Sequence, residues 1–233
     1  MENAHYFLHV TDTHLCFDAE APDICCTEQA LRSLYQTAFA WDHRPAFVLI
    51  TGDLVHEGTS ADYARAKTLL QELDEQYHTK TYPALGNHDN RENFNSAFRE
   101  QASDQPVDYC VQNEWLRWIV LDSSCGQVIG QLFGSQLAWL EQELCDPTDC
   151  PTILALHHPV YGTTTAETDA NNLATPDRLI RLLQDHPVDG ILCGHSHEAT
   201  LVTEQGLPPQ FVGAGAASAA LPLIQGRVQF RKQ

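Results

Sequence analysis

Five short segments of this chain carry carboxylate, amide or imidazole side chains, and apolar runs lead into them. The segments are residues 12–14, 52–53, 86–89, 157–158 and 194–197. Four apolar runs are short and rich in β-branched residues, as strands buried on both faces tend to be. These runs are residues 6–10, 46–50, 153–156 and 190–193. Ligands collect beyond the carboxyl ends of strands in layered α/β folds, so we expect such a fold, with the five segments converging on one cleft.

The donor types in these segments fit a hydrolytic metal centre. Imidazole, carboxylate and amide groups, with no thiolate among them, suit manganese, iron or zinc. Two metals about 3.5–4 Å apart need a carboxylate that bridges them and room for a bridging water. Asp53 is the natural bridge. Asp12 and His14 are alternate residues leaving a strand, so both can turn toward one ion, and the pattern predicts a two-metal centre.

The ordered set of motifs resembles a known family. The motifs DxH, GD, GNHD, HHP and GHSH follow the order found in the calcineurin-like metallophosphoesterase superfamily. Within it they look most like the bacterial class III 3′,5′-cyclic nucleotide phosphodiesterases, and the resemblance spans roughly residues 5 to 215. It implies an α/β fold: a four-layer α-β-β-α sandwich of two mixed sheets flanked by helices, the metallo-dependent phosphatase fold.

The resemblance also implies a ligand set for each metal. One metal would be held by Asp12, His14, Asp53 and His197. The other would be held by Asp53, Asn87, His157 and His195. His157 is preferred to His158, because the family's ligand is the histidine separated from the proline by one residue. These donors accept two Mn²⁺ or Fe²⁺/Fe³⁺ ions, and Zn²⁺ is a further candidate.

The implied reaction is hydrolysis of a small phosphodiester, with conversion of 3′,5′-cyclic AMP to 5′-AMP as the first choice. A metal-bridging hydroxide would attack phosphorus in line with the leaving oxygen, while both metals neutralise charge on the equatorial oxygens. His88 is similar to the family's histidine that protonates the leaving oxygen or clamps the phosphate. Asp89 is expected to accept a hydrogen bond from the other ring nitrogen of His88 and so to fix its tautomer.

Three alternatives to this reaction differ in what they require of the sequence. A glycerophosphodiesterase or a broad-specificity phosphoesterase would use the same donors. A non-catalytic scaffold with this fold predicts missing ligands, and the complete set here opposes it. A nuclease predicts a basic groove, which a net charge of -18, from 31 acidic and 13 basic residues, also opposes. A small diester remains feasible, because two bound cations dominate the local field and distant surface charge is screened within roughly 8 Å.

The length of 233 residues favours a single metallophosphoesterase domain over residues 1–233. No apolar stretch is long enough to span a membrane, and the first strand begins too early to leave room for a signal peptide. The eight cysteines form no CxxC pattern, which fits reduced thiols. We therefore expect a cytoplasmic protein that binds no nucleic acid polymer and no membrane, and a monomer and a homodimer both stay open.

Helical spacing of apolar residues marks three further segments. Residues 60–77 are expected to form a helix that Ser60 caps. Thr175 is expected to cap a helix whose first residue is Pro176, and Ser135 to precede another helix.

Residues 161–175 lack this spacing and follow the expected ligand His157 directly. We expect them to form a loop over the rim of the cleft that affects substrate choice. In this loop, Asp169 and Asn172 are similar to polar positions of the cyclic nucleotide subfamily, although a solvated loop explains them equally well. His56 and His158 can approach the cleft, but ordinary structural roles are expected for both.

Overall fold

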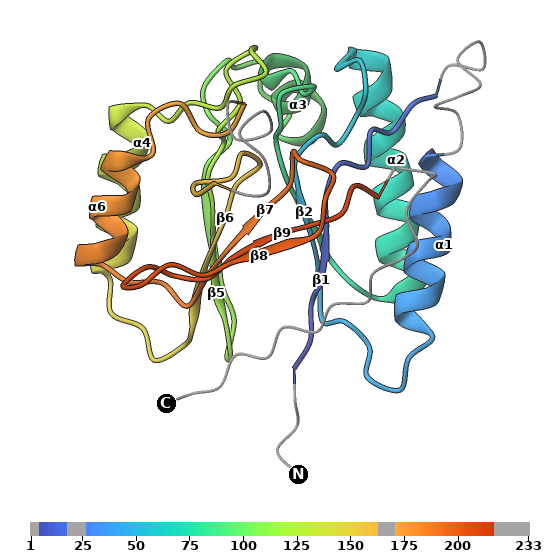
Figure 1. The fold of residues 1–233 in the computed structure, drawn as a ribbon. Coiled ribbons are helices and arrows are strands. Elements are labelled where there is room, and N and C mark those ends of the chain that lie inside the picture. The colour runs from blue at the N-terminus through green and yellow to red at the C-terminus, as the bar shows by residue number, and fades with distance from the viewer. Residues whose placement is uncertain (1–4, 18–26, 163–170, 217–233) are drawn as a thin grey trace.

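The computed structural model describes residues 5–17, 27–162 and 171–216, and within them two β-sheets pack face to face between helices (Figure 1). The first sheet contains β1 (Leu8–Val10), β2 (Val48–Thr51) and β3 (Thr81–Ala84). Its neighbouring strands are parallel, with Leu8 paired to Val48 and Val48 paired to Thr81. The carboxyl ends of these strands therefore lie at one edge of the sheet.

The second sheet has the strand order β4-β5-β6-β7-β9-β8 in the described residues. Its strands are β4 (Tyr109–Gln112), β5 (Arg117–Val120), β6 (Thr152–Ala155), β7 (Gly190–Cys193), β8 (Thr200–Val202) and β9 (Gln210–Val212). The four strands from β5 to β9 in this order are parallel, whereas the outer strands β4 and β8 run antiparallel to their neighbours.

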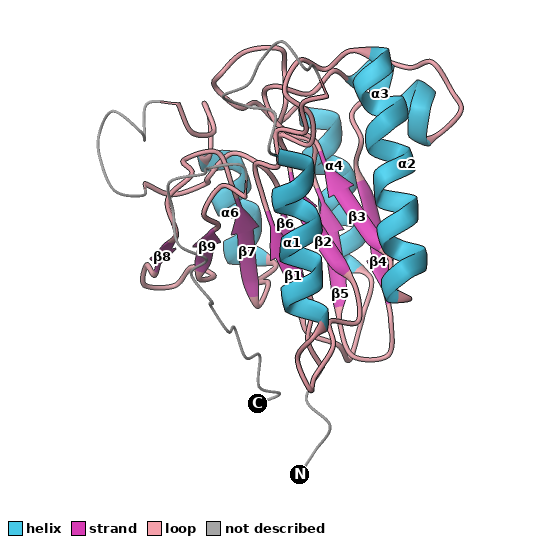
Figure 2. Ribbon diagram, turned by 90° about the vertical axis from the view of Figure 1, so that its right-hand side faces the viewer, coloured by secondary structure: helices cyan, strands magenta, loops and turns pink. Residues whose placement is uncertain are grey.

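Helices cover the outer face of each sheet, as the two ribbon views show (Figures 1 and 2). The first sheet is covered by α1 (Thr27–Phe39), α2 (Ser60–Tyr77) and α3 (Arg91–Phe98). The second sheet is covered by α4 (Gly134–Cys145) and α6 (Asp177–Asp185). The expected four-layer arrangement of helices, sheet, sheet and helices is confirmed.

Side chains along the central strands point alternately to the two faces of the sheet, and both faces are apolar. In β2, Val48 and Ile50 pack toward the helices while Leu49 packs toward the second sheet. Side chains one residue apart on a strand point to opposite faces, so an uninterrupted apolar run serves two cores at once. Between the sheets the rings of Phe47 and Trp118 stack with centroids 4.2 Å apart. This inter-sheet core fixes the two sheets relative to each other.

The four strands expected from apolar runs are present as β1, β2, β6 and β7. The third strand of the first sheet, β3, is not among them, because it contains Pro83 and reads as an interrupted run. Proline cannot donate a hydrogen bond to a neighbouring strand and is confined to positions such as edge strands. In the described residues, β3 is one of the two edge strands of this sheet. None of the helices that the structure describes is long and apolar enough to cross a membrane.

The expected bounds of the helix over residues 60–77 are confirmed, whereas its cap and the starts of two other helices differ from those expected. Thr59, not Ser60, caps α2: its hydroxyl oxygen accepts a hydrogen bond from the Asp62 amide at 3.2 Å. The helix after Thr175 begins at Asp177, and no side chain caps it. The helix α4 begins at Gly134, so Ser135 lies inside its first turn. The two expected caps were each placed one residue away from the observed cap position, and Ser135 lies inside its helix rather than before it. Sequence patterns locate helix ends only to within one or two residues.

Candidate metal centre

Every candidate ligand lies just beyond the carboxyl end of a strand. The structure brings together all seven: Asp12 and His14 after β1, Asp53 after β2, Asn87 after β3, His157 after β6, and His195 and His197 after β7. Parallel strands in both sheets end on the same side, so segments far apart in the sequence meet there. The expected convergence on one cleft is therefore observed, and the assignment of each residue as a ligand stays a prediction.

The first group of donors is formed by Asp12, His14, Asp53 and His197, whose ligand atoms lie within 4.8 Å of one another. The Nε2 atom of His14 is 3.5 Å from Asp53 Oδ2 and 3.2 Å from His197 Nε2. The Nε2 atom of His197 is 3.2 Å from Asp12 Oδ1. These four atoms enclose a position for one cation.

The second group of donors contains Asn87, His157, His195 and again Asp53. Asn87 Oδ1 lies 2.9 Å from His195 Nδ1 and 3.0 Å from His157 Nε2, and the two nitrogens are 3.3 Å apart. His157 Nε2 is 3.4 Å from Asp53 Oδ2. The same oxygen of Asp53 thus faces both groups, as a bridging carboxylate would.

The spacing of the donor atoms fits bound cations. With bonds of about 2.1 Å and angles between tetrahedral and octahedral values, neighbouring ligand atoms lie about 3.0–3.4 Å apart. The contacts in both groups, from 2.9 to 3.5 Å, match this spacing. Two imidazole nitrogens at 3.2 Å can share at most one proton, and a cation between them satisfies both lone pairs. The residues present therefore fit a pair of divalent cations.

The backbone is left-handed at five of the candidate ligands: Asp12, His14, Asp53, His195 and His197 have φ between 39° and 75°. Such conformations cost roughly 1–3 kcal/mol per residue and persist where the surrounding structure enforces them, often at functional sites. Gly52, just before Asp53, has φ of 90°, and a Cβ there would lie 2.6 Å from His157 Nδ1. A glycine at this position lets the loop after β2 pass directly against His157.

Burial and nearby charges hold Asp53, His14 and His195 in the protonation states that metals bind. Burial alone would raise the pKa of Asp53, but the nearby charges of His157 and His14 outweigh it and hold the pKa below its usual range. Burial lowers the pKa of His14 to about 4, although Asp53 and Asp12 oppose the change. Burial also lowers the pKa of His195 to about 4. Ionised carboxylates and neutral imidazoles are the forms that ligate metals.

Two histidines of the site depart from this pattern: His157 and His197, whose hydrogen bond to the Asp12 carboxylate raises its pKa. At His157, burial disfavours the charged form, but the Asp53 carboxylate more than compensates and raises the pKa of His157 to about 9. Its Nδ1 atom lies 2.9 Å from the carbonyl oxygen of Thr51, which accepts a hydrogen bond and turns Nε2 toward the site. A cation bound at Nε2 would replace a proton there, so binding is expected to release protons.

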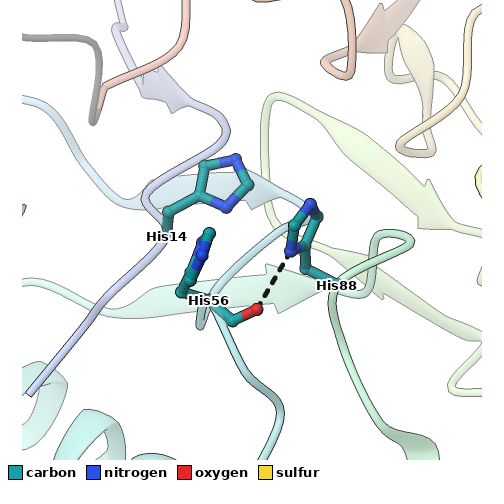
Figure 3. Close-up of side chains that lie close together, drawn as sticks. All are labelled: His14, His56 and His88. Carbon is teal, nitrogen blue, oxygen red and sulfur yellow. Dashed lines mark hydrogen bonds between the residues drawn. The ribbon is translucent and has the colours of Figure 1, made fainter. Parts of the chain in front are cut away.

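His88 lies beside the first group, in a cluster with His14 and His56 (Figure 3). Its Nδ1 atom donates to the carbonyl oxygen of His56 at 2.9 Å, which leaves Nε2 without that proton in the neutral ring. The ring of His88 stacks on that of His56 at 5.1 Å and meets His14 edge-on at 4.7 Å. His56 therefore orients His88, a role that its position alone did not reveal.

The expected hydrogen bond between Asp89 and the ring of His88 is not present, and this is a correction. The Asp89 carboxylate accepts hydrogen bonds from the amides of Leu54 and Gly86, at 3.0 and 2.9 Å, and from the Tyr63 hydroxyl, at 2.8 Å. A third amide, that of Val55, donates at 3.3 Å. Asp89 thus ties the loops after β2 and β3 together, and the His56 carbonyl takes the role expected for Asp89.

A cavity of about 300 Å³ opens over the donors. It is lined by Asp53, Asn87, His88, Val128, Asn171, His195, Ser196 and His197. His158 is fully buried, with its ring nitrogens 2.8 Å from Ser123 Oγ and 3.0 Å from the Val128 carbonyl oxygen, so its expected structural role fits. Asn172 is buried rather than facing the cavity, and Asp169 lies outside the described residues.

Val128 and Asn171 line the cavity but were not predicted from the sequence. Both lie on irregular segments, where no periodic pattern indicates which side chain faces inward. The only signal for Asn171 was its place in the expected rim loop.

Comparison with known proteins places the chain among phosphoesterases. The family model for calcineurin-like phosphoesterase matches residues 5–199. A probable cyclic nucleotide phosphodiesterase of Rhodococcus erythropolis is 35% identical over 206 residues, which is 88% of this chain and 68% of that protein. A cAMP/cGMP dual specificity phosphodiesterase of Mycobacterium tuberculosis is 31% identical, over 97% of this chain and 72% of that protein.

A second activity occurs among the relatives. A glycerophosphodiester phosphodiesterase of Enterobacter lignolyticus is 33% identical over 68% of this chain and 58% of that protein. Among solved structures, a dimetal phosphatase from Danio rerio is similar in fold, with a TM-score of 0.72 and 16% sequence identity. That similarity covers 92% of this chain and 88% of the other.

Proposed function

The chain belongs to the calcineurin-like phosphoesterase family, and from this premise we propose that it hydrolyses 3′,5′-cyclic AMP to 5′-AMP. Family membership makes it a metal-dependent phosphoesterase, and its relatives act on cyclic nucleotides or on glycerophosphodiesters. The choice of a cyclic nucleotide rests on the two relatives of that class, which match 88% and 97% of this chain.

One observation carries the proposed chemistry: a single oxygen of Asp53 faces both groups of donors. Asp53 Oδ2 lies 3.5 Å from His14 Nε2 and 3.4 Å from His157 Nε2. We assign Asp12, His14, Asp53 and His197 to one metal, and Asp53, Asn87, His157 and His195 to the other. The pair of ions, when bound, supplies charge to stabilise the phosphoryl group and acidifies a water molecule.

The residues around the metals orient the substrate and move a proton. In the neutral ring of His88, Nδ1–H donates a hydrogen bond to the His56 carbonyl oxygen, so Nε2 is the ring nitrogen left for the substrate in the cavity that His88 lines. When protonated, Nε2 donates its proton to the leaving ester oxygen, and the Nδ1 hydrogen bond keeps the ring in place meanwhile. The buried carboxylates of Asp12 and Asp53 contribute negative charge that offsets the bound cations.

The size of the cavity and the charge of the protein favour a small substrate. A volume of about 300 Å³ is at the lower end of the range for small-molecule sites. A chain with a net charge of -18 repels a polyanion, because nucleic acid binding depends on clustered lysine and arginine. A small phosphodiester brings one negative charge directly to the metals. That the protein is cytoplasmic stays a prediction, and a monomer and a homodimer both stay open.

A glycerophosphodiester is the second candidate substrate, favoured by the glycerophosphodiester phosphodiesterase that is 33% identical to this chain. The same metal centre would cleave it, so only the contacts with its organic groups distinguish the two reactions. A non-catalytic scaffold is disfavoured, because all seven donors converge.

Hydrolysis by the manganese-loaded protein tests these alternatives. Purified protein is given 3′,5′-cyclic AMP, glycerophosphoethanolamine and bis(p-nitrophenyl) phosphate in parallel, and kcat/KM is measured for each. We expect the highest value among the natural diesters for cyclic AMP, with 5′-AMP as the product. Protein stripped with a chelator serves as the control and should be inactive until manganese is returned.

The outcomes separate the substrate from the chemistry. Cleavage of bis(p-nitrophenyl) phosphate together with glycerophosphoethanolamine, but not of cyclic AMP, would replace the substrate and keep the metal centre. Equal rates with stripped and loaded protein would contradict the metal-dependent mechanism.

A further inference from the structure

We propose that Val128 is a specificity-determining residue that contacts the organic group of the diester on the side of the ester bond that stays intact. In cyclic AMP both ester oxygens belong to one nucleoside, whereas in an open diester this side carries the non-leaving group. The inference rests on the proposed phosphodiesterase function and adds a residue outside the metal and proton-transfer machinery. Val128 lines the cavity over the metal centre, where its neighbours are mostly polar or charged. Its side chain is 55% exposed, so it contributes little to the core and is free to contact a ligand.

The backbone of Val128 is hydrogen-bonded to a buried histidine. Its carbonyl oxygen accepts a hydrogen bond from His158 Nε2 at 3.0 Å, and the other ring nitrogen of His158 lies 2.8 Å from Ser123 Oγ. His158 is fully buried. A loop that is tied to a buried ring presents its side chains with little loss of entropy on binding.

Two further contacts support this loop. A Cβ on Gly130 would lie 2.7 Å from the His158 Cβ, so the loop passes directly over the histidine. The carbonyl oxygen of Gly130 accepts a hydrogen bond from the Ala174 amide at 2.8 Å, and its amide donates to the Asn172 carbonyl at 3.2 Å. The segment next to Asn171, which also lines the cavity, is therefore fixed to the same loop.

The base of the loop is anchored by Arg91. This arginine donates from Nε to the buried carboxylate of Asp122 at 2.7 Å and from Nη2 to the Ser124 carbonyl. Arg91 opens α3, directly after the loop that carries Asn87 and His88. The loop with Val128 is thus connected both to the His88 loop and to the strand end that carries His157.

The position of Val128 indicates which part of the substrate it meets. The Val128 carbonyl oxygen is hydrogen-bonded to the His158 ring. That ring lies 4.7 Å from the His195 ring and 4.9 Å from the His157 ring. Val128 is therefore on the side of the second donor group. His88 packs at 4.7 Å against His14, on the side of the first group. If His88 protonates the leaving oxygen, Val128 faces the opposite ester group.

The chemistry of the side chain fits this role. A valine gains free energy from covering apolar surface and offers no group for the phosphate. The organic group of a diester is the part of the substrate with apolar surface, whereas the phosphoryl oxygens face the metals. Val128 would therefore favour a larger organic group over a smaller one without altering the reaction at phosphorus.

A pair of synthetic diesters isolates this contact. Bis(p-nitrophenyl) phosphate and methyl p-nitrophenyl phosphate have the same leaving group and differ in the non-leaving group. For the manganese-loaded protein and its variants, the ratio of the two kcat/KM values is measured. We expect Val128→Ala to lower this ratio about fivefold, the effect of losing apolar contact area of about one or two methyl groups.

A neighbouring residue provides a matched control. Ile129 is 41% exposed and does not line the cavity, so Ile129→Ala removes a similar apolar side chain from the same loop. Its ratio should equal that of the unmodified protein. Val128→Thr keeps the shape of the side chain but adds a hydroxyl, and it should lower the ratio as well.

The inference fails if Val128→Ala leaves the ratio unchanged, or if Ile129→Ala changes it equally, while the unmodified protein cleaves both diesters. If the unmodified protein cleaves cyclic AMP but neither synthetic diester, the inference fails and the proposed function stands. If it cleaves none of the three, the proposed function fails as well. A lower ratio in the two Val128 variants alone supports the inference.

Discussion

The floor of the cavity and its walls are built in different ways. The floor is formed by the seven candidate metal ligands. Among them, Asp12 and His157 are fully buried and lie two residues beyond a strand, where contacts of 3.2 and 3.4 Å to other ligands fix their ligand atoms. Val128 on the wall is 55% exposed and lies on an irregular loop. The fold therefore determines the chemistry at the floor, whereas loop residues that hardly affect folding are free to determine the substrate.

The largest effect is expected at the residue shared by the two donor groups. Asp53→Asn keeps the size of the side chain but removes the negative charge that faces both His14 and His157. Weaker metal binding and lost charge stabilisation of several kcal/mol should lower kcat/KM roughly 10³-fold or more, for every diester alike. Activity and metal content of the purified variant are measured together. A variant that keeps both metals and full activity would show that Asp53 is not the bridge.

A smaller but still general loss is expected at His88, which is at the edge of the floor. His88→Ala removes the proton donor and should lower kcat roughly 10²-fold, while both metals stay bound. The loss should be smaller for bis(p-nitrophenyl) phosphate than for cyclic AMP, because p-nitrophenolate leaves readily without a proton. An equal loss for both substrates, or a loss of metal, would assign His88 to the metal centre instead of proton transfer.

The Val128 variants complete this series from floor to wall. Their expected effect is about fivefold and appears only in the comparison between substrates. If kcat/KM fell equally for all diesters, Val128 would affect the general chemistry as the candidate metal ligands do. The distinction between the two regions would then not hold.

The same distinction explains how much the sequence could predict. Residues on the floor follow strands whose apolar runs are visible in the sequence, so Asp12, Asp53 and His157 could be placed at one edge of two sheets. The strand β3 was missed because of Pro83, yet Asn87 after it was still identified, since its motif did not depend on the strand. Parallel strands make distant segments meet, and this convergence could be inferred from the order of elements alone.

Residues that act through backbone atoms could not be predicted. The His56 carbonyl oxygen, rather than the Asp89 side chain, accepts the hydrogen bond from Nδ1 of His88. Every residue has a backbone carbonyl, so the residue type at a loop position does not indicate which carbonyl forms such a bond. Asp89 was misread because an acid next to a histidine suggests a pair. Successive side chains on a loop often point in different directions, and Asp89 turns to Tyr63 and three backbone amides. The exposed residues Val128 and Asn171 carry no pattern either.

The central claim is that Asp53 holds two cations side by side in one centre. Electron paramagnetic resonance of the manganese-loaded protein tests it directly, together with the number of metal ions bound per chain. We predict two ions per chain and the dense hyperfine pattern of an exchange-coupled manganese pair. A single ion per chain, or the spectrum of isolated manganese ions at full occupancy, would contradict the claim.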